Sequence, residues 1–512
     1  MRYFLFLLPL ILLGKEISLE WLSGKPTSVA KDYYIWRYLH QDINCSQATQ
    51  AIQQAKSVNR KLFFAYANDC SGPIQRIATC MKMSAKELLD QDPACAAAGI
   101  NSYKLSTLPK EKIALLLEKT SAFHLPKAYR LYLKEHPTPK DLLYLFNNSS
   151  KNYRKKLDRY LTPKEIEEIS GHWRFKTFVK RVVLSDEYPK LAYSLLLTQA
   201  KNIDPNTSFL LAMNALKFKL PYIALDFLNR AKDAYYKEDI DKANFWIYRI
   251  KGDKKSLKNV ADSWDINIYS ILAKEKLGQK LSYVIPEAKS KRGDINLSDP
   301  FFWNRFLQEH GKKEEYFYTD TIALYAYLLE KESKYKIHPY ILPYHQELDD
   351  LNTSRRALIY ALARQESRFI PGAISHSFAL GMMQFMPFLA KATAKKLQLQ
   401  NFNLDMMFDP KVALRFANDH LDYLETKLAT PLFIAYGYNG GIGFTKRLAL
   451  PLFCKYDPFL AMELVPYSES RKYGKKVLAN YYVYKEILNE PFSIWNYFER
   501  LQNMRRSFCE KE

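Results

Sequence analysis

The residues with the clearest potential for chemistry lie in a short stretch around position 366. Glu366 stands four residues after Leu362, which itself stands four residues after Leu358. Residues four apart share one face of a helix, so this spacing places a carboxylate on an otherwise apolar face. A carboxyl group in such surroundings is partly removed from water, which disfavours its charged form and suits it to general acid catalysis.

A structural role competes with this catalytic interpretation. Arg364 and Arg368 flank Glu366, and either an ion pair with one of them or exposure in the last helical turn would make Glu366 structural. The spacing alone favours the structural role. The local sequence also offers no second acid, because Asp405 is the first Asp or Glu after Glu366, although the segment 405–425 could supply one in space.

A helix over residues 355–369 must position Glu366. The Asn-Thr-Ser sequence at 352–354 supplies a helix cap, and the Pro-Gly pair at 371–372 stops the helical pattern. A polar turn follows this break. An earlier break at 338–343 predicts where the last domain begins.

Residues 40–335 form a succession of helix signals with short breaks. Thr162 to Glu165 combine an N-cap threonine, a proline at the first helical position and a glutamate three residues after the cap, which is a capping box. Similar starts occur at 107–111, 138–141 and 185–189. Such frequent starts favour helix-turn-helix stacking, although no period is strict enough to identify a named repeat.

Composition favours a mainly helical protein of several domains. A chain of 512 residues exceeds the size at which a single core stops growing. A hydrophobic share of 48% and a charged share of 25% argue against both disorder and a multi-span membrane protein. With only 16 glycines, few positions are free for the many turns of an all-β fold.

The N-terminus has the order of a secretory signal. Met1-Arg2-Tyr3 precedes an apolar run over residues 4–13, which is too short to span a bilayer. We expect a signal peptide over residues 1–18 and therefore export from the cytoplasm. An uncleaved anchor and a buried N-terminal helix remain alternatives, because no Ala-x-Ala cleavage site follows the run.

The six cysteines permit disulfides in an exported protein. Four fall in the first hundred residues and two in the last sixty: Cys45, Cys70, Cys80, Cys95, Cys454 and Cys509. We therefore expect pairing within each end of the chain. The connectivity stays open, and free thiols are the alternative. No Cys-x-x-Cys or Cys/His spacing typical of a metal site occurs, which disfavours zinc.

The chain carries 76 Lys and Arg against 54 Asp and Glu, a net charge of +22, which indicates attraction to a polyanion. Nucleic acid, an anionic membrane face and cell-wall polymer all fit this charge. The lysines are spread over the chain and form no stripe with interleaved aromatic residues, which disfavours nucleic acid. For most of these lysines we expect a solvated surface position.

Four linked motifs resemble those of the soluble lytic murein transglycosylases, over residues 345–490. The motifs are Arg364-Gln-Glu-Ser-x-Phe369 with Pro371, Ala373 and Ser375; Gly381-x-Met-Gln-x-Met-Pro387; Ala435-Tyr-x-Tyr-Asn-Gly-Gly-x-Gly443; and Val465-Pro-Tyr-x-Glu-x-Arg-x-Tyr473 with Asn480-Tyr-Tyr. Upstream the resemblance is weaker. Residues 243–253 and 268–278 look like the end of that family's superhelical domain, and 20–200 resemble it only in being helical.

The resemblance implies a mainly α fold. An N-terminal α-superhelix of helical hairpins, ring- or U-shaped, is expected over 19–285, and connecting helices over 286–343. A lysozyme-like catalytic domain, with at most a small β hairpin, is expected over 344–512.

The resemblance also implies an activity. The substrate is the peptidoglycan glycan strand, cut at the β-1,4 bond between N-acetylmuramic acid and N-acetylglucosamine to leave a 1,6-anhydro end. Glu366 is then the sole catalytic carboxylate, first acid and then base, because a hydroxyl of the substrate itself attacks. We expect exolytic action by a monomer, with no cofactor, no metal and no nucleic acid, and with peripheral or anchored membrane contact left open.

Six further site residues carry over by resemblance. Ser375 and Gln384 contact substrate near the acid, and Met386 lines the groove. Tyr438 hydrogen-bonds or orients the acid, Asn439 fixes its loop and Glu469 binds the acetamido side of the sugar. Four neighbours are expected to pack in the core or to lie in the loop instead: Met382, Met383, Phe385 and His376.

Three positions depart from the family pattern. Met382 replaces a leucine and Gly440 an alanine, both mild changes. Phe378 replaces a small residue and is expected to enlarge the turn at the rim of the groove.

Three functions compete with the transglycosylase. A goose-type lysozyme-like hydrolase would need a second carboxylate. A non-catalytic helical-repeat scaffold would bind cell wall or a partner, and a nucleic-acid-type polyanion binder ranks last.

Overall fold

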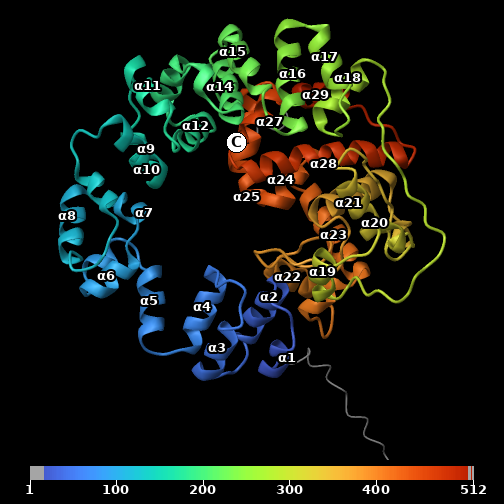
Figure 1. Ribbon diagram of the computed structural model, residues 1–512, viewed down its shortest axis with the longest axis horizontal. Coiled ribbons are helices and arrows are strands. Elements are labelled where there is room, and N and C mark those ends of the chain that lie inside the picture. The colour runs from blue at the N-terminus through green and yellow to red at the C-terminus, as the bar shows by residue number, and fades with distance from the viewer. Residues whose placement is uncertain (1–16, 505–508, 510–512) are drawn as a thin grey trace, which may run out of the picture. The chain divides into compact units, whose positions relative to one another are not determined.

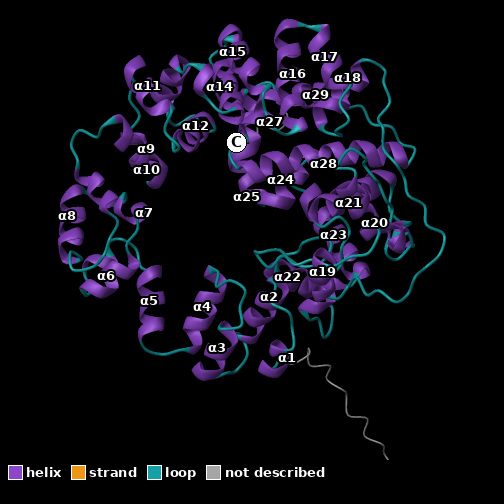
Figure 2. Ribbon diagram, in the orientation of Figure 1, coloured by secondary structure: helices purple, strands orange, loops and turns teal. Residues whose placement is uncertain are grey.

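The computed structural model describes residues 17–504 and Cys509, and these residues are mainly helical (Figure 2). Among them no β-strand occurs, and the β-type pairing consists of three isolated bridges. The mainly α prediction is confirmed. Most of the expected signal peptide lies outside the described residues, which begin with a buried Ile17 and with Ser18 as the N-cap of helix α1.

The chain divides into two compact units, each built from two separate stretches. The first unit comprises 1–72 and 284–427, and the second comprises 73–283 and 428–512. This division follows contacts rather than chain order, so it differs from the division into consecutive domains expected above. The expected boundaries at 285 and 343 stay a prediction.

The first unit contains two groups of helices. α2 contacts α3, α4 and α19, and α23 contacts α21 and α22. Its helices are α1 (Leu19–Ser23), α2 (Val29–Tyr38), α3 (Cys45–Ile52), α4 (Arg60–Asp69), α19 (Pro300–Gln308), α20 (Ile322–Glu332), α21 (Thr353–Glu366), α22 (Pro387–Lys396) and α23 (Pro410–Glu425), with a short 3₁₀ helix η7 (Leu404–Phe408).

The second unit begins with short helices that follow one another along the chain (Figure 1). They are α5 (Pro73–Lys82), α6 (Pro93–Gly99), α7 (Ser102–Leu105), α8 (Lys110–Lys119), α9 (Pro139–Asn148), α10 (Lys151–Lys156), α11 (Pro163–Ser170), α12 (Phe175–Val183) and α13 (Pro189–Ser194). The capping boxes predicted at Thr162 and Thr138 are both present. The start predicted at 107–111 was placed too early, because Pro109 is the N-cap of α8 and no side chain caps it.

Further helices complete the second unit. Neighbours from α14 to α18 contact each other in sequence order, as helix-turn-helix stacking requires, and α24 contacts α28. They are α14 (Pro205–Lys217), α15 (Pro221–Ala231), α16 (Lys237–Lys251), α17 (Lys254–Ala261), α18 (Ile268–Lys276), α24 (Pro431–Gly440), α25 (Ile442–Phe444), α26 (Leu450–Lys455), α27 (Pro458–Leu464), α28 (Ser468–Ile487) and α29 (Ile494–Asn503).

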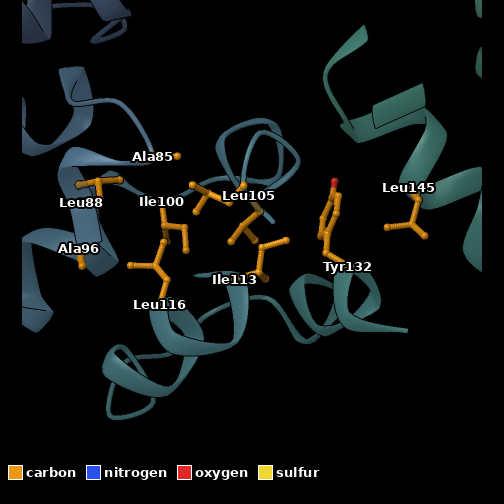
Figure 3. Packing of buried hydrophobic residues seen from close by; sticks show 10 residues of the cluster. Ala85, Leu88, Ala96, Ile100, Leu105, Ile113, Leu116, Tyr132 and Leu145 are labelled. Atoms are coloured by element: carbon orange, nitrogen blue, oxygen red, sulfur yellow. The ribbon is translucent and has the colours of Figure 1, made fainter. Parts of the chain in front are cut away.

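Apolar side chains from consecutive helices fill the core of the second unit. Figure 3 shows one such cluster, in which Leu105, Ile113 and Leu116 from α7 and α8 meet Tyr132 and Leu145. All five side chains are almost completely removed from water. Each short helix therefore contributes its apolar face to a core shared with its neighbours.

The cysteines pair within each end of the chain, as expected. Cys45–Cys70 lies in the first unit, and Cys80–Cys95 and Cys454–Cys509 lie in the second. None of the helices between residues 17 and 504 has the length and apolar content needed to cross a membrane.

Candidate active site

Helix α21 places Glu366 at its last position. The side chain of Asn352 accepts a hydrogen bond from the Arg355 N–H at 2.9 Å, which confirms the predicted cap. The helix is shorter than the predicted 355–369, because Arg368 and Phe369 have positive φ angles of 56° and 67°. This left-handed backbone turns the chain sharply away after Glu366, whose side chain is half-buried.

An ion-pair network around the buried carboxylate of Glu330 holds this end of α21. Arg364 Nη2 lies 2.6 Å from Glu330 Oε1, and Arg364 Nη1 donates to the Pro339 carbonyl at 2.6 Å. Arg368 forms an ion pair with the other oxygen of Glu330. Both arginines that flank Glu366 are therefore paired with a carboxylate of α20, a partner that lies more than 30 residues away and carries no local signature.

The loop after α21 folds back on the helix end. Ser367 Oγ donates to the Met382 carbonyl at 2.8 Å. Leu380 and Phe385 exchange backbone hydrogen bonds of 2.8 and 3.0 Å, and Leu380 also forms an antiparallel bridge with Ile374. These bridges make the small hairpin-like element that the resemblance allowed for.

Ser375 and Gln384 lie in this loop and hold its shape. Ser375 Oγ accepts from the Ala379 N–H at 2.9 Å. Gln384 Nε2 donates to the Gly381 carbonyl at 2.7 Å and to the Ala373 carbonyl at 3.3 Å. Met386 follows as the half-buried N-cap residue of α22. The first unit therefore contains four of the expected site residues, Glu366, Ser375, Gln384 and Met386, in one helix end and the loop that follows it.

Gly381 allows the backbone of this loop to pass very close to η7. Its φ is +72°, and a Cβ at this position would lie 2.0 Å from the Met407 carbonyl oxygen. The loop backbone thus approaches the backbone of η7 so closely that no side chain fits between them.

Phe378, which we expected to enlarge the turn at the rim of the groove, is buried against another helix. Its side chain is only 1% exposed, and its ring centroid lies 5.8 Å from those of both Tyr33 and Trp36 in α2. Lys61 Nζ donates to the carbonyl of the adjacent Ser377 at 2.6 Å. The large side chain is accommodated because α2 supplies an aromatic socket, an arrangement that the local sequence gave no means to predict.

The remaining expected residues lie in the second unit. Tyr438 and Asn439 stand at the end of α24, and Glu469 stands in the first turn of α28. Asn439 Nδ2 donates to Glu469 Oε1 at 3.3 Å, and Asn439 Oδ1 accepts from Ser470 Oγ at 2.7 Å. The structure therefore brings Asn439 and Glu469 together and adds Ser470, which the sequence analysis missed.

Close packing of α24 on α28 explains why these residues meet. A Cβ on Gly474 would lie 2.2 Å from Cε1 of the buried Tyr436, so the ring of α24 fills the space that the glycine leaves on α28. Beside this contact, Lys475 Nζ lies 2.9 Å from both Glu463 Oε2 and the Tyr269 hydroxyl. These three residues are at most 4% exposed and connect α18, α27 and α28.

Neighbouring groups lower the pKa of the Glu463 carboxyl group. Burial raises the pKa of its carboxyl group, but the adjacent Lys475 ammonium and the hydrogen bond from Tyr269 outweigh burial and hold the pKa below its ordinary value of 4.5.

The acidic residues of 405–425 have partners of their own. Asp405 pairs with Arg37, Asp419 with Lys396 at 2.6 Å, and Asp409 caps α23. Asp422 and Glu425 both pair with Arg355, at 2.8 and 2.7 Å.

No group of three or more His, Cys, Asp or Glu side chains that could hold a metal ion occurs among the described residues.

The stretch that holds α21, the following loop and α24 matches a known domain type. Residues 343–449 match the family model described as "Transglycosylase SLT domain". The resemblance to soluble lytic murein transglycosylases is thereby confirmed for this part of the chain.

Individual relatives agree with this assignment. The chain is similar to a putative soluble lytic murein transglycosylase of Haemophilus influenzae, with 29% identity over 197 residues, 36% of this chain and 31% of the relative. It is also similar to the soluble lytic murein transglycosylase of Escherichia coli K12, with 31% identity over 121 residues, 23% of this chain and 19% of the relative. The matched part thus spans less than a third of these curated relatives.

Two solved structures are also similar to the chain. One is an inactive mutant of the lytic transglycosylase Slt of Pseudomonas aeruginosa, with 16% identity and a TM-score of 0.43, and the match covers 91% of this chain and 74% of that one. The other is the 70 kDa soluble lytic transglycosylase of Escherichia coli, with 14% identity and a TM-score of 0.43, and the match covers 92% of this chain and 83% of that one.

Proposed function

We propose that this protein is an exported lytic transglycosylase that cuts the β-1,4 bond between N-acetylmuramic acid and N-acetylglucosamine of peptidoglycan. The observation that carries the proposal is the position of Glu366, at the end of an apolar helix within the matched SLT domain. The relatives are named as soluble lytic murein transglycosylases, and these names support the same substrate.

Glu366 performs both proton transfers in this proposal. As a carboxylic acid it protonates the glycosidic oxygen while the bond to the anomeric carbon breaks. As a carboxylate it then takes the proton from the muramoyl O6 hydroxyl, which forms the new bond to the same carbon. No water is consumed, and the hydroxyl owes its high effective concentration to its attachment to the reacting sugar.

The partners of the nearby acids support a single catalytic carboxylate. Glycosidases with two carboxylates place them about 5–9.5 Å apart. Asp422 and Glu425 pair instead with Arg355, which stands 11 residues before Glu366 on α21 and hence about 16 Å away along the helix axis.

The other site residues complete the proposal. Ser375, Gln384 and Met386 contact the sugars next to the cleaved bond, Tyr438 orients Glu366, and Asn439 and Glu469 bind the acetamido side of the substrate. The hydrogen bond between Asn439 and Glu469 supports a shared role for this last pair. We further propose release of products from strand ends, a monomeric enzyme in the periplasm and a signal peptide over residues 1–18.

The test is mass spectrometry of the products that the purified protein releases from isolated peptidoglycan. We expect muropeptides one water lighter than those of a hydrolase, and none from Glu366→Gln. Glu309→Gln, which alters an exposed glutamate of the same unit, is the matched control and should retain full activity.

Two outcomes would favour the competing functions. Reducing muramic acid ends would indicate a goose-type lysozyme-like hydrolase. Undiminished lysis by Glu366→Gln would remove Glu366 from the chemistry, and a chain that binds peptidoglycan without any release would be a scaffold.

A further inference from the structure

A pocket in the first unit is lined by none of the residues assigned to catalysis or substrate binding above. It has a volume of about 690 Å³, and its walls come from α1 and α2, the segment leading into α19, and the segment joining η7 to α23. This volume lies within the range of small-molecule sites, and the proposed chemistry leaves it without a role.

Three aromatic side chains form one wall of the pocket. The rings of Tyr34 and Phe301 are stacked with centroids 5.6 Å apart, and Trp21 meets both edge-on at 4.9 and 5.9 Å. Tyr34 and Phe301 are buried, whereas Trp21 is half-buried. The wall is therefore rigid and offers an apolar flank to a ligand, mainly through Trp21.

The carboxylates of the pocket are hydrogen-bond acceptors that are already partly neutralised. Asp405 accepts from the Tyr34 hydroxyl at 3.1 Å and pairs with Arg37. Asp299 pairs with Arg305 at 3.0 Å. Because ionised carboxylates only accept hydrogen bonds, these groups call for a ligand that is rich in donors such as hydroxyl groups.

Lys25 supplies the positive charge of the pocket. Its Nζ lies 4.8 Å from the ring centroid of Trp21 and 5.3 Å from that of Phe301, so the ammonium group stands over the aromatic wall. In this position it can donate to a carbonyl oxygen of a ligand that lies against Trp21.

These features exclude several ligand classes. A polyanion would face the carboxylates of Asp299, Asp405 and Asp409, and a wholly apolar ligand would remove them and Lys25 from water without compensation. A sugar ring has hydroxyl donors at its edge and an apolar face for the aromatic wall, and an N-acetyl group adds the carbonyl oxygen that Lys25 requires.

We propose that this pocket binds a neutral N-acetylated sugar of the glycan strand, as a second glycan site that performs no cleavage. The ligand class rests on the proposed function, whereas the pocket itself does not. Two sites on one chain would bind a polymeric strand more tightly than either site alone. Binding at one site raises the effective concentration of the same strand at the second site.

The experiment measures binding of chitotetraose, a β-1,4-linked N-acetylglucosamine oligomer, by calorimetry to the full chain carrying Glu366→Gln. We expect two binding sites per chain. Adding either Trp21→Ala or Lys25→Ala should remove one site or weaken it at least tenfold. Trp173→Ala, which alters a tryptophan that is 68% exposed in the second unit, is the control and should leave both sites unchanged.

Three results would overturn the proposal: unchanged stoichiometry and affinity in both pocket variants, a single site in the parent protein, or binding of a free stem peptide in place of the sugar. Since Lys25 is a half-exposed side chain, Lys25→Ala tests the pocket even if Trp21→Ala lowers stability. Failure of the proposed function would appear separately, as the absence of anhydro products from the unmodified protein.

Discussion

Glu330 and Arg364 form an ion pair in which Oε1 and Nη2 lie 2.6 Å apart, and this pair fixes the end of the helix that carries Glu366 to helix α20. The two side chains are only 5% and 12% exposed, and Arg368 joins the same carboxylate. The position of the proposed acid therefore depends on a carboxylate that takes no part in the chemistry.

Removing this carboxylate should destabilise the protein. Glu330→Gln leaves two guanidinium groups without their counter-charge, so we expect a loss of about 3–5 kcal/mol in the free energy of unfolding, measured with denaturant. Glu332→Gln is the matched control, because Glu332 pairs with Lys313 at 2.6 Å near the same helix end but is 46% exposed. It should cost less than about 1 kcal/mol. Equal losses in the two variants would contradict the structural role of Glu330.

Two glycines with positive φ allow the stability cost of backbone strain to be measured separately from the cost of a steric conflict. Gly441 has φ and ψ angles of +83° and 155°, in a region that is almost restricted to glycine, and open space around a built Cβ, so Gly441→Ala should cost about 1–3 kcal/mol through backbone strain alone. Gly381→Ala carries similar strain and also meets the Met407 carbonyl, so it should cost at least about 2 kcal/mol more. Thermal unfolding compares the two variants, and a smaller effect of Gly381→Ala would argue against the close approach of loop and η7.

The socket of Phe378 predicts an effect on stability rather than on the groove. Phe378→Ala removes a fully buried ring and should cost about 3–5 kcal/mol. Phe378→Gly loses the same ring but relieves the backbone, whose φ is +62°, and should be about 1 kcal/mol less destabilising. Denaturant unfolding measures both values. A wild-type stability for either variant, with altered affinity for glycan, would favour the original expectation of a rim residue.

The buried pair of Lys475 and Glu463 predicts a specific response to acid. The folded-state pKa of Glu463 lies below its ordinary value of 4.5, so its contribution to stability is complete above about pH 4.5 and is lost as pH falls through the lower folded value. Glu463→Gln should cost about 3–5 kcal/mol at neutral pH, because the ammonium group of Lys475 stays buried.

The pH profile distinguishes this effect from a loss of packing. The free energy of unfolding of Glu463→Gln should fall less than that of the parent protein between about pH 5 and pH 3, since the variant lacks the carboxyl group that takes up a proton. Parallel profiles would indicate that Glu463 is not ionised in the folded protein. The double variant Glu463→Gln with Lys475→Met should recover part of the lost stability.

Local signals in the sequence predicted many of the helices, including the one that ends at Glu366. The cap at Asn352 and the stop at 371–372 predicted the helix of Glu366, because caps and breaks depend on neighbours along the chain. The loop that contains Gly381 could be recognised from its sequence motif for the same reason. The predicted end at Phe369 was three residues too long, since the positive φ of Arg368 has no signature in an arginine.

Partners from distant stretches could not be predicted. Glu330, the socket of Phe378 in α2 and the pairing of Glu463 with Lys475 each depend on which helices meet, which the spacing of apolar residues leaves open. Lysines were expected on the surface, and Lys475 is an exception because its carboxylate partner comes from another helix.

The contacts of the first unit limit how the protein can be dissected. A fragment that begins at residue 344 would retain the proposed acid but would lose α2, and with it Tyr33, Trp36 and Arg37. Phe378 and Asp405 would then face solvent, one as an exposed aromatic ring and the other as a carboxylate without its counter-ion. We therefore expect such a fragment to be poorly soluble by itself, and co-expression with residues 17–72 to restore it.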